Sequence, residues 1–480
     1  MNKRVIAKSL GILLLCEAGL MVLPMLVSLY YGEAEYRAFL YTIIILLAFG
    51  ICGYMIKPGS KTIYARDGFA IVAFGWILIS IFGGLPFMFS GIMTNPADAF
   101  FEASSGFTTT GATILSSVEG LPNGVMFWRS FTHWVGGMGV LVFTMAFLPL
   151  MGTGTMHIMK AESPGPNPGK LVPKLAHTAK LLYIIYIIIT VAEIILLKVG
   201  GMSFLDASIH TFGTVGTGGF SNKNISVGAY NSVYIEAVIT IFMIVCGVNF
   251  GLYYAALKGG IKNILKDEEF KVYFGIIAAS IVLITINLTG TVYSSIGQSF
   301  RYSSFQVGSI ITTTGYATTD FNTWPTFSKM ILVVLMFTGA CAGSTAGGMK
   351  SIRLLVQAKM AKKSILKIVH PNSVYVVRIN GKAVDKETLK EVPVFLFLYM
   401  FITVAAILVL SLEGKDFTTT ITAVAATMGN IGPGLGEVGP MGNFGGFNNI
   451  SKLVMSFCML LGRIEIYPIL ITMMPSSWRK

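Results

Sequence analysis

Charged residues are scarce in this 480-residue chain: only 12% are Asp, Glu, Lys or Arg, whereas 54% are hydrophobic. A soluble domain of this size would carry about a quarter charged residues. Apolar runs such as 43–54, 181–197 and 394–410 are almost free of charge. They are continuous rather than alternating, which favours transmembrane helices over a β-barrel. We therefore expect an all-α polytopic membrane protein.

Cysteine and histidine are also sparse, with five of each, and no cysteine pair has CxxC spacing. All five cysteines lie in apolar segments, which indicates small buried side chains rather than a disulfide or metal framework. No histidines stand at metal-ligand spacing. The HExxH and GxSxG motifs are absent, so the sequence gives no support for a membrane enzyme.

The N-terminus has the charge pattern of a secretory leader, with Lys3, Arg4 and Lys8 before an apolar run. The run continues to about Tyr30, contains Glu17 and lacks a convincing small-residue cleavage site. We therefore expect a first transmembrane helix instead of a removed leader.

The net charge of +13 is distributed unevenly along the chain. Hydropathy predicts about ten crossings: 9–30, 38–56, 68–90, 126–151, 181–200, 232–257, 272–292, 327–348, 392–411 and 452–474. Alternating the loops between them places 26 of the 35 Lys and Arg residues on one side. By the positive-inside rule, both termini are cytoplasmic. The basic character then reflects topology and contact with membrane lipid, not nucleic-acid binding.

After residue 67 one order recurs four times: a crossing helix, a short non-crossing helix, a glycine turn and a second crossing helix. The expected units are 1–66, with two extra crossings, then 67–180, 181–271, 272–391 and 392–480. Non-helical backbone is tolerated at membrane depth only where protein or a water-filled cavity surrounds it. We therefore expect the four pseudo-symmetric repeats to surround one central pore.

The four turns are the candidate ion filter. Glycine tolerates positive φ and lets the backbone turn its carbonyls toward an axis, where they can replace the hydration shell of K⁺. The C-terminal dipole of each short helix favours a cation there, and acidic outer loops predict an electrostatic funnel. An alternative is that these are ordinary helix ends, but four turns in register favour the pore. The candidate residues are Thr109, Thr110, Gly111, Gly216, Thr217, Gly218, Thr313, Thr314, Gly315, Asn430, Ile431 and Gly432.

A small-residue stretch in the third repeat is the candidate gate. Glycine inside a helix costs about 1 kcal/mol relative to alanine, so several together favour a break. The alternative is helix packing, because Gly339, Gly343 and Gly347 have GxxxG spacing. The candidate residues are Gly339, Gly343, Ser344, Thr345, Gly347 and Gly348.

Arg463 lies within the last predicted crossing, where a cation costs about 2.5–3.5 kcal/mol on insertion scales. One interpretation is a fixed positive charge beside the permeation path that limits cation flow. The other is a structural ion pair with an intramembrane acid such as Glu236 or Glu193. The residues alone leave both interpretations open.

Several segments resemble the superfamily of potassium transporters that includes bacterial Trk and Ktr proteins and plant HKT proteins. The similarity is greatest to the bacterial Trk membrane subunit, because of the two extra N-terminal crossings. The segments are 105–113, 133–139, 160–166 and 462–465.

The resemblance implies K⁺ as the transported ion, because glycine stands at all four filter positions. It also implies an intramembrane gating loop at 339–348, with Arg463 facing it, and a location in the bacterial inner membrane. It further implies a homodimer with one pore per subunit and a cytosolic nucleotide-binding ring that senses NAD or adenine nucleotides. No nucleotide fingerprint occurs in this chain, so no organic cofactor is expected on it.

Two alternative functions remain open at this point. One is symport of K⁺ coupled to H⁺ or Na⁺. The other is secondary transport of another small solute through broken helices at a midplane site. That second class predicts two inverted halves, whereas this sequence has four units in one orientation.

Overall fold

The computed structural model describes residues 1–57, 64–137, 139 and 175–478, and most of these are helical. Three helices precede the repeats: α1 (Lys3–Leu20), α2 (Val22–Tyr30) and α3 (Tyr36–Tyr54). The first repeat contains α4 (Ala65–Gly83), α5 (Leu85–Phe89), α6 (Pro96–Phe107) and α7 (Asn123–Gly137). The second contains α10 (Leu175–Val199), α11 (Phe204–Val215), η2 (Ser226–Tyr230), α12 (Val233–Cys246), α13 (Phe250–Gly259) and α14 (Lys262–Lys266).

The third and fourth repeats follow the same order. The third contains α15 (Glu268–Leu288), α16 (Ile296–Ile311), η3 (Phe321–Thr323), α17 (Thr326–Met336), α18 (Ser351–Val369), β1 (Arg378–Ile379) and β2 (Lys382–Ala383), the two strands pairing antiparallel. The fourth contains α19 (Lys386–Ser411), α20 (Phe417–Met428), η4 (Gly436–Val438), α21 (Asn449–Ile464), α22 (Ile466–Met473) and η5 (Pro475–Trp478). The all-α membrane fold expected from the sequence is confirmed.

Eight of the ten expected crossings have a direct counterpart in the described residues. Six helices are long and apolar enough to cross a membrane, and two bent pairs bring the number to eight. Helices α12 and α13 meet at 88°, and α21 and α22 meet at 117°. Of the other two expected crossings, 327–348 is helical only as far as Met336, and most of the C-terminal half of 126–151 lies outside the described residues.

The four short helices α6, α11, α16 and α20 each begin at a capping side chain. In each case its oxygen accepts a hydrogen bond from a backbone N–H of the first turn, which would otherwise lack a partner. The capping residues are Asn95, Ser203, Ser295 and Asp416. The caps set where each short helix starts, and therefore where its C-terminal end reaches the turn that follows.

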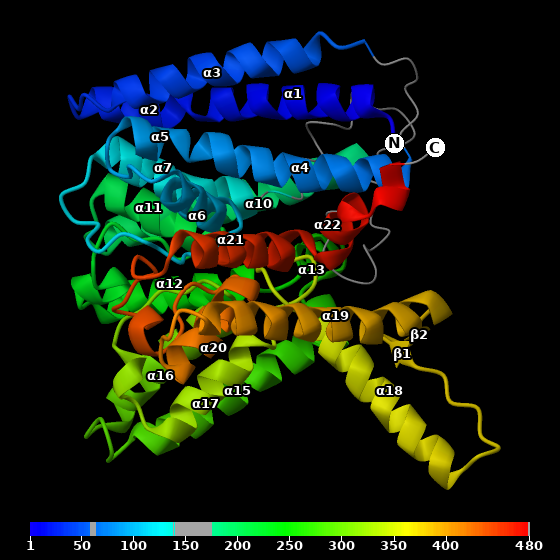
Figure 1. Ribbon diagram of the computed structural model, residues 1–480. Helices are drawn as coiled ribbons and strands as arrows, with labels where there is room; N and C mark the ends of the chain where they lie inside the picture. The colour runs from blue at the N-terminus through cyan, green and yellow to red at the C-terminus, as the bar shows by residue number, and fades with distance from the viewer. Residues whose placement is uncertain (58–63, 138, 140–174, 479–480) are drawn as a thin grey trace.

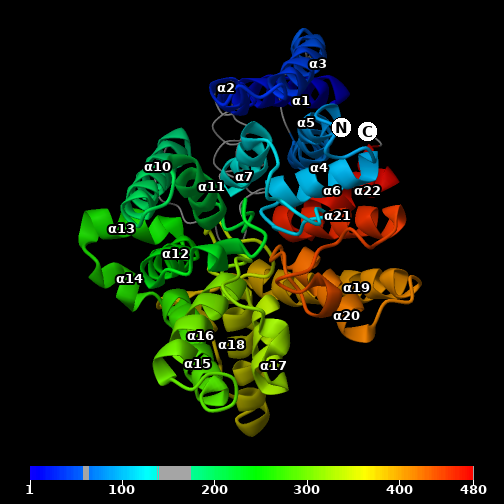
Figure 2. The same cartoon turned by 90° about the vertical axis from the view of Figure 1, so that its left-hand side faces the viewer.

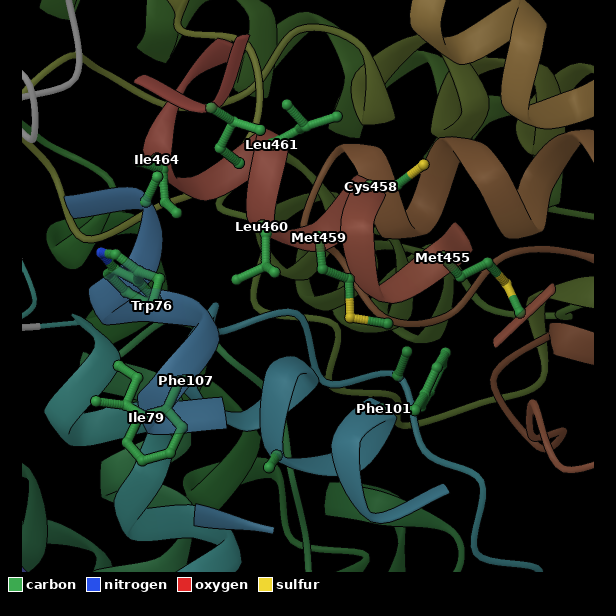
Figure 3. Close-up of a cluster of buried hydrophobic side chains, with 14 of the residues drawn as sticks. Trp76, Ile79, Phe101, Phe107, Met455, Cys458, Met459, Leu460, Leu461 and Ile464 are labelled. Carbon is green, nitrogen blue, oxygen red and sulfur yellow. The ribbon is translucent and has the colours of Figure 1, made fainter. Parts of the chain in front are cut away.

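The four repeats lie around a common centre, and α1–α3 lie outside the ring beside the first repeat (Figure 2). The first and last repeats meet through a buried apolar cluster between α4, α6 and α21 (Figure 3), which includes Trp76, Phe107, Met459 and Leu460. This contact closes the ring. Both termini lie at the same end of the molecule as the β1–β2 hairpin (Figure 1).

The outer helices present large apolar side chains outward. Phe49 on α3, Ile286 on α15 and Phe401 on α19 are 59%, 69% and 63% exposed. An apolar surface of this kind is unfavourable in water and suits the hydrocarbon of a bilayer.

Candidate ion-conduction site

The four turns adopt the same backbone conformation. Each short helix is followed by a non-glycine residue at positive φ, which is uncommon for residues with a side chain. Two residues later comes a glycine, also at positive φ. The first set is Thr109, Thr217, Thr313 and Asn430, with φ of 56°, 58°, 59° and 53°. The second set is Gly111, Gly219, Gly315 and Gly432, with φ of 81°, 79°, 81° and 94°.

This geometry corrects the register of the second turn. The sequence interpretation matched Gly218 to Gly111, but the glycine at positive φ is Gly219. Gly218 instead occupies the position of Thr110, immediately before the glycine. The two adjacent glycines are indistinguishable in the sequence, and the folded backbone is needed to separate them.

The four turns close on one another in a ring. A Cβ atom added to each glycine would lie within 3.0 Å of the carbonyl oxygen that precedes the glycine of the next repeat. Both the backbone angle and the lack of space therefore require glycine. The pairs are Gly111 with the oxygen of Gly218, Gly219 with Thr314, Gly315 with Ile431, and Gly432 with Thr110. The last pair returns from the fourth repeat to the first.

A cavity of about 220 Å³ lies beside this ring, and all four glycines line it. Its lining includes the cationic side chains Arg129 and Lys223 and no carboxylate. The acidic bias predicted for the outer loops therefore does not extend to the wall of the cavity. Two of the outer acids form ion pairs: Asp98 pairs with Lys452 at 2.7 Å, and Glu437 pairs with Lys415 at 2.6 Å.

A buried ion pair braces the first turn against the second. Glu102 on α6 accepts from Arg129 on α7 at 2.7 Å and from the backbone N–H of Ile114 at 3.0 Å. Arg129 also donates to the carbonyl of Ser221 at 3.1 Å, and its guanidinium lies 3.5 Å from the ring centre of Phe220. Contacts with several partners offset the cost of burying both charges.

The small-residue segment after α17 is a loop in contact with the ring. Residues 339–349 are not helical, and Gly339, Gly343 and Gly348 have φ of 65°, 71° and 62°. The helix-packing alternative is therefore wrong, because GxxxG spacing brings glycines to one face only in a continuous helix.

The far end of this loop touches two of the four turns. The N–H of Gly347 donates to Thr313 Oγ1 at 2.9 Å, and the N–H of Gly348 donates to Asn430 Oδ1 at 3.3 Å. A Cβ on Gly347 would lie within 3.0 Å of the Asn430 side chain. The predicted gate residues are thus brought directly against the predicted filter residues.

Arg463 lies in the last turn of α21, a position that favours a cation. Its guanidinium donates to the carbonyl of Thr345 in the loop and, at 2.7 Å, to the carbonyl of Gly136 at the end of α7. Glu236, one proposed partner, instead pairs with Arg301 at 2.6 Å. The interpretation of Arg463 as an ion pair with Glu236 is therefore wrong.

Comparisons with known proteins agree with this arrangement. A profile of the TrkH family, described as cation transport proteins, matches residues 35–480. The chain belongs to the TrkH family. It is 37% identical to the Trk system potassium uptake protein TrkH of Salmonella typhimurium, over the whole of both chains. It is 36% identical to TrkG of Escherichia coli, over 99% of both.

The fold is also that of a solved TrkH-family structure. The crystal structure of the potassium transporter TrkH from Vibrio parahaemolyticus matches with a TM-score of 0.90 and 35% identity, over all of both chains. The family comprises transport proteins, so this chain is a membrane transport protein and not an enzyme.

The sequence did not predict the roles of Tyr316 and Gly213 in this TrkH-family site. Tyr316, in the third turn, donates to the carbonyl of His210 at 2.9 Å, and so links the third repeat to the second. Gly213 leaves space for its hydroxyl, since a Cβ there would lie within 3.0 Å of it. No local motif marks such a contact, because the partners are 106 residues apart. Segment 160–166 lies outside the described residues.

Proposed function

We propose that this chain is a potassium-selective uptake pore in which K⁺ passes the carbonyl groups of four turns. The ring that Gly111, Gly219, Gly315 and Gly432 form with the preceding carbonyls is the observation that carries the proposal. Carbonyl rings can replace the hydration shell of K⁺. The C-terminal ends of α6, α11, α16 and α20 add a field that favours a cation. The names of the relatives, which are potassium uptake proteins, support K⁺ as the ion.

We propose further that the loop 339–348 obstructs the path and that Arg463 holds it there. The loop's contacts with Thr313 and Asn430 support this role, as does the bond from Arg463 to the Thr345 carbonyl. A fixed guanidinium beside the path also repels cations. Opening then requires the loop to leave these partners.

We also propose a location and partners for the pore. The chain lies in a bacterial inner membrane with both termini cytoplasmic, as the charge distribution supports. Two copies associate, each with its own pore. A cytosolic nucleotide-binding ring contacts the basic face of α18, whose Lys362, Lys363 and Lys367 support an anionic partner or lipid.

The filter assignment is tested by uptake in a potassium-uptake-deficient strain at low K⁺. Gly111→Ser, Gly219→Ser and Gly315→Ser should each fail to restore growth, because a side chain there meets a carbonyl of the next turn. Gly120→Ser is the matched control: Gly120 also has positive φ, 83°, but nothing lies within 4 Å of its Cβ position. Growth of the three filter variants equal to that of the control would remove the assignment.

Coupled transport with H⁺ or Na⁺ is the alternative to a pore. A pore predicts a zero-current potential that follows the K⁺ gradient alone. Coupling predicts that a pH or Na⁺ gradient also shifts this potential, so measurements with each gradient separately decide between the two.

A further inference from the structure

A buried carboxylate outside the ring binds near both ends of the loop 339–348, here called the gate loop. Glu269 lies in the first turn of α15 and is 7% exposed. Its Oε1 accepts from the backbone N–H of Ala342 at 2.7 Å and from the Ser351 hydroxyl at 3.1 Å. Ala342 stands near the start of the loop and Ser351 just after its end. One oxygen atom therefore fixes the distance between the two ends.

The base of the loop is closed by two further bonds. The N–H of Ser351 donates to the carbonyl of Ala340 at 3.0 Å, and the N–H of Cys341 donates to the carbonyl of Gly247 at 3.0 Å. The second bond anchors the loop at the break between α12 and α13. Removal of the Glu269 carboxylate would leave the partly buried N–H of Ala342 without its acceptor, which costs free energy.

The two residues before Glu269 bind the cytosolic hairpin β1–β2. Asn380, at the tip of the hairpin, donates through its side chain to Asp267 Oδ2 at 2.6 Å and through its backbone to Glu268 Oε1 at 3.0 Å. In return its Oδ1 accepts from the backbone N–H of Glu268 at 2.8 Å. Lys359 on α18 contacts Glu268 and donates to the carbonyl of Arg378 at 2.7 Å.

We propose that Glu269 is a positioning residue for the gate loop, and that Asp267–Glu269 transmits movement of the hairpin to that loop. The three residues form the N-cap and first turn of one helix. A displacement of the hairpin therefore moves the carboxylate that fixes the loop ends. The inference rests on the proposed role of the loop in conduction, but the position of the loop can be measured independently of flux.

Cys341 reports on the loop directly, because it lies within the loop and is fully buried. The full-length protein in lipid is treated with N-ethylmaleimide, and the modification of each cysteine is followed by peptide mass spectrometry. Glu269→Ala should raise the labelling rate of Cys341 about tenfold or more, as expected for loss of a hydrogen bond to a charged group. Cys458, buried on α21, should keep its rate and so report an intact fold.

Three further variants make the result specific. Glu269→Gln retains an oxygen acceptor at the same place and should label nearly as slowly as wild type. Ser351→Ala removes one hydrogen bond to Glu269 but leaves the N–H of Ala342 with its acceptor, and should give an intermediate rate. Glu387→Ala is the matched control, because Glu387 stands in the first turn of α19 but is exposed; its rate should equal wild type.

The link to the hairpin is tested by Asn380→Gly, which keeps a residue tolerant of its φ of 51° and removes the side chain. Lys382→Ala, at an exposed hairpin position, is the control. Asn380→Gly should raise Cys341 labelling and Lys382→Ala should not. In the double variant with Glu269→Ala, labelling should match Glu269→Ala alone, because coupled sites are non-additive.

The same samples are assayed for K⁺ flux. Faster labelling together with faster flux supports both the positioning role and the gate. Faster labelling with unchanged flux supports the positioning role and contradicts the gate. Labelling of Cys341 that does not change in Glu269→Ala and Ser351→Ala overturns the inference, whatever the flux.

Discussion

At the scale of single residues, Gly219 differs from the adjacent Gly218 in both its backbone angle and its surroundings. It combines a φ of 79° with a Cβ position that meets the Thr314 carbonyl. Strain of this kind costs about 1–3 kcal/mol at one position. We expect Gly219→Ala to lower K⁺ over Na⁺ selectivity at least tenfold, measured by competition between the two ions in proteoliposomes. Selectivity equal to that of Gly120→Ala would contradict the assignment.

Arg463 gives a second prediction at this scale. Arg463→Ala removes both the charge and the bond to the loop carbonyl, so we expect faster K⁺ flux, by about tenfold for each 1.4 kcal/mol of barrier removed. Arg463→Lys keeps the charge but not the forked donor geometry, so its flux should lie between those of the wild type and Arg463→Ala. Radioactive Rb⁺ uptake into vesicles measures the rates. Unchanged or slower flux in Arg463→Ala would reject its role as a barrier.

The Glu102–Arg129 pair predicts a large effect on stability. Removing one member of a buried pair typically costs about 3–5 kcal/mol, so Glu102→Gln should lower the melting temperature of the detergent-solubilised protein markedly. Lys415→Ala breaks the pair with Glu437, whose side chain is 56% exposed, and should change stability by about 1 kcal/mol or less. Similar melting temperatures for the two variants would contradict the bracing role.

At the scale of elements, the short helices depend on their caps. Asp416 accepts from the backbone N–H of Thr419 at 3.0 Å, and hydrogen bonds from the Thr419 side chain and backbone lower the pKa of Asp416. Asp416→Ala should destabilise α20 by about 1 kcal/mol, whereas Asp416→Asn should retain most of the cap. Thermal unfolding measures the difference.

The pH dependence of this cap has a definite sign. The folded state holds the carboxylate with a lowered pKa, so the stabilisation is present above the ordinary carboxyl pKa and is lost as pH falls through the lowered value. The stability gap between wild type and Asp416→Ala should therefore shrink in acid. A gap that grows as pH falls would contradict the assignment of Asp416 as an ionised cap.

Crossing helices could be predicted from the sequence, whereas breaks within helices could not. Long apolar runs predict crossings such as α3 and α19 because burial in lipid depends on composition alone. The break at Glu465, a non-glycine residue with φ of 70°, is not predictable in this way. Its carboxylate accepts from Arg353, 112 residues away, at 2.5 Å. Glu269 was missed for the same reason, since its partner Ala342 is 73 residues distant.

At the scale of the whole molecule, the arrangement depends on closure between the first and last repeats. The apolar cluster around Trp76, Phe107 and Met459 joins them (Figure 3), while Gly432 meets the Thr110 carbonyl at the ring itself. The sequence predicted four repeats around one axis because unpaired backbone is not tolerated in lipid. It did not predict which carbonyl each glycine faces, since that depends on packing between repeats.

The zero-current potential of the purified protein in proteoliposomes tests the central claim most directly. With K⁺ gradients across the membrane and equal Na⁺ on both sides, a K⁺-selective pore predicts a shift of about 59 mV for each tenfold change in the K⁺ gradient. We expect this shift to be lost in Gly219→Ser and to persist in Gly120→Ser. A wild-type potential that does not change with the K⁺ gradient, or a full shift in Gly219→Ser, would contradict a K⁺-selective pore with this filter.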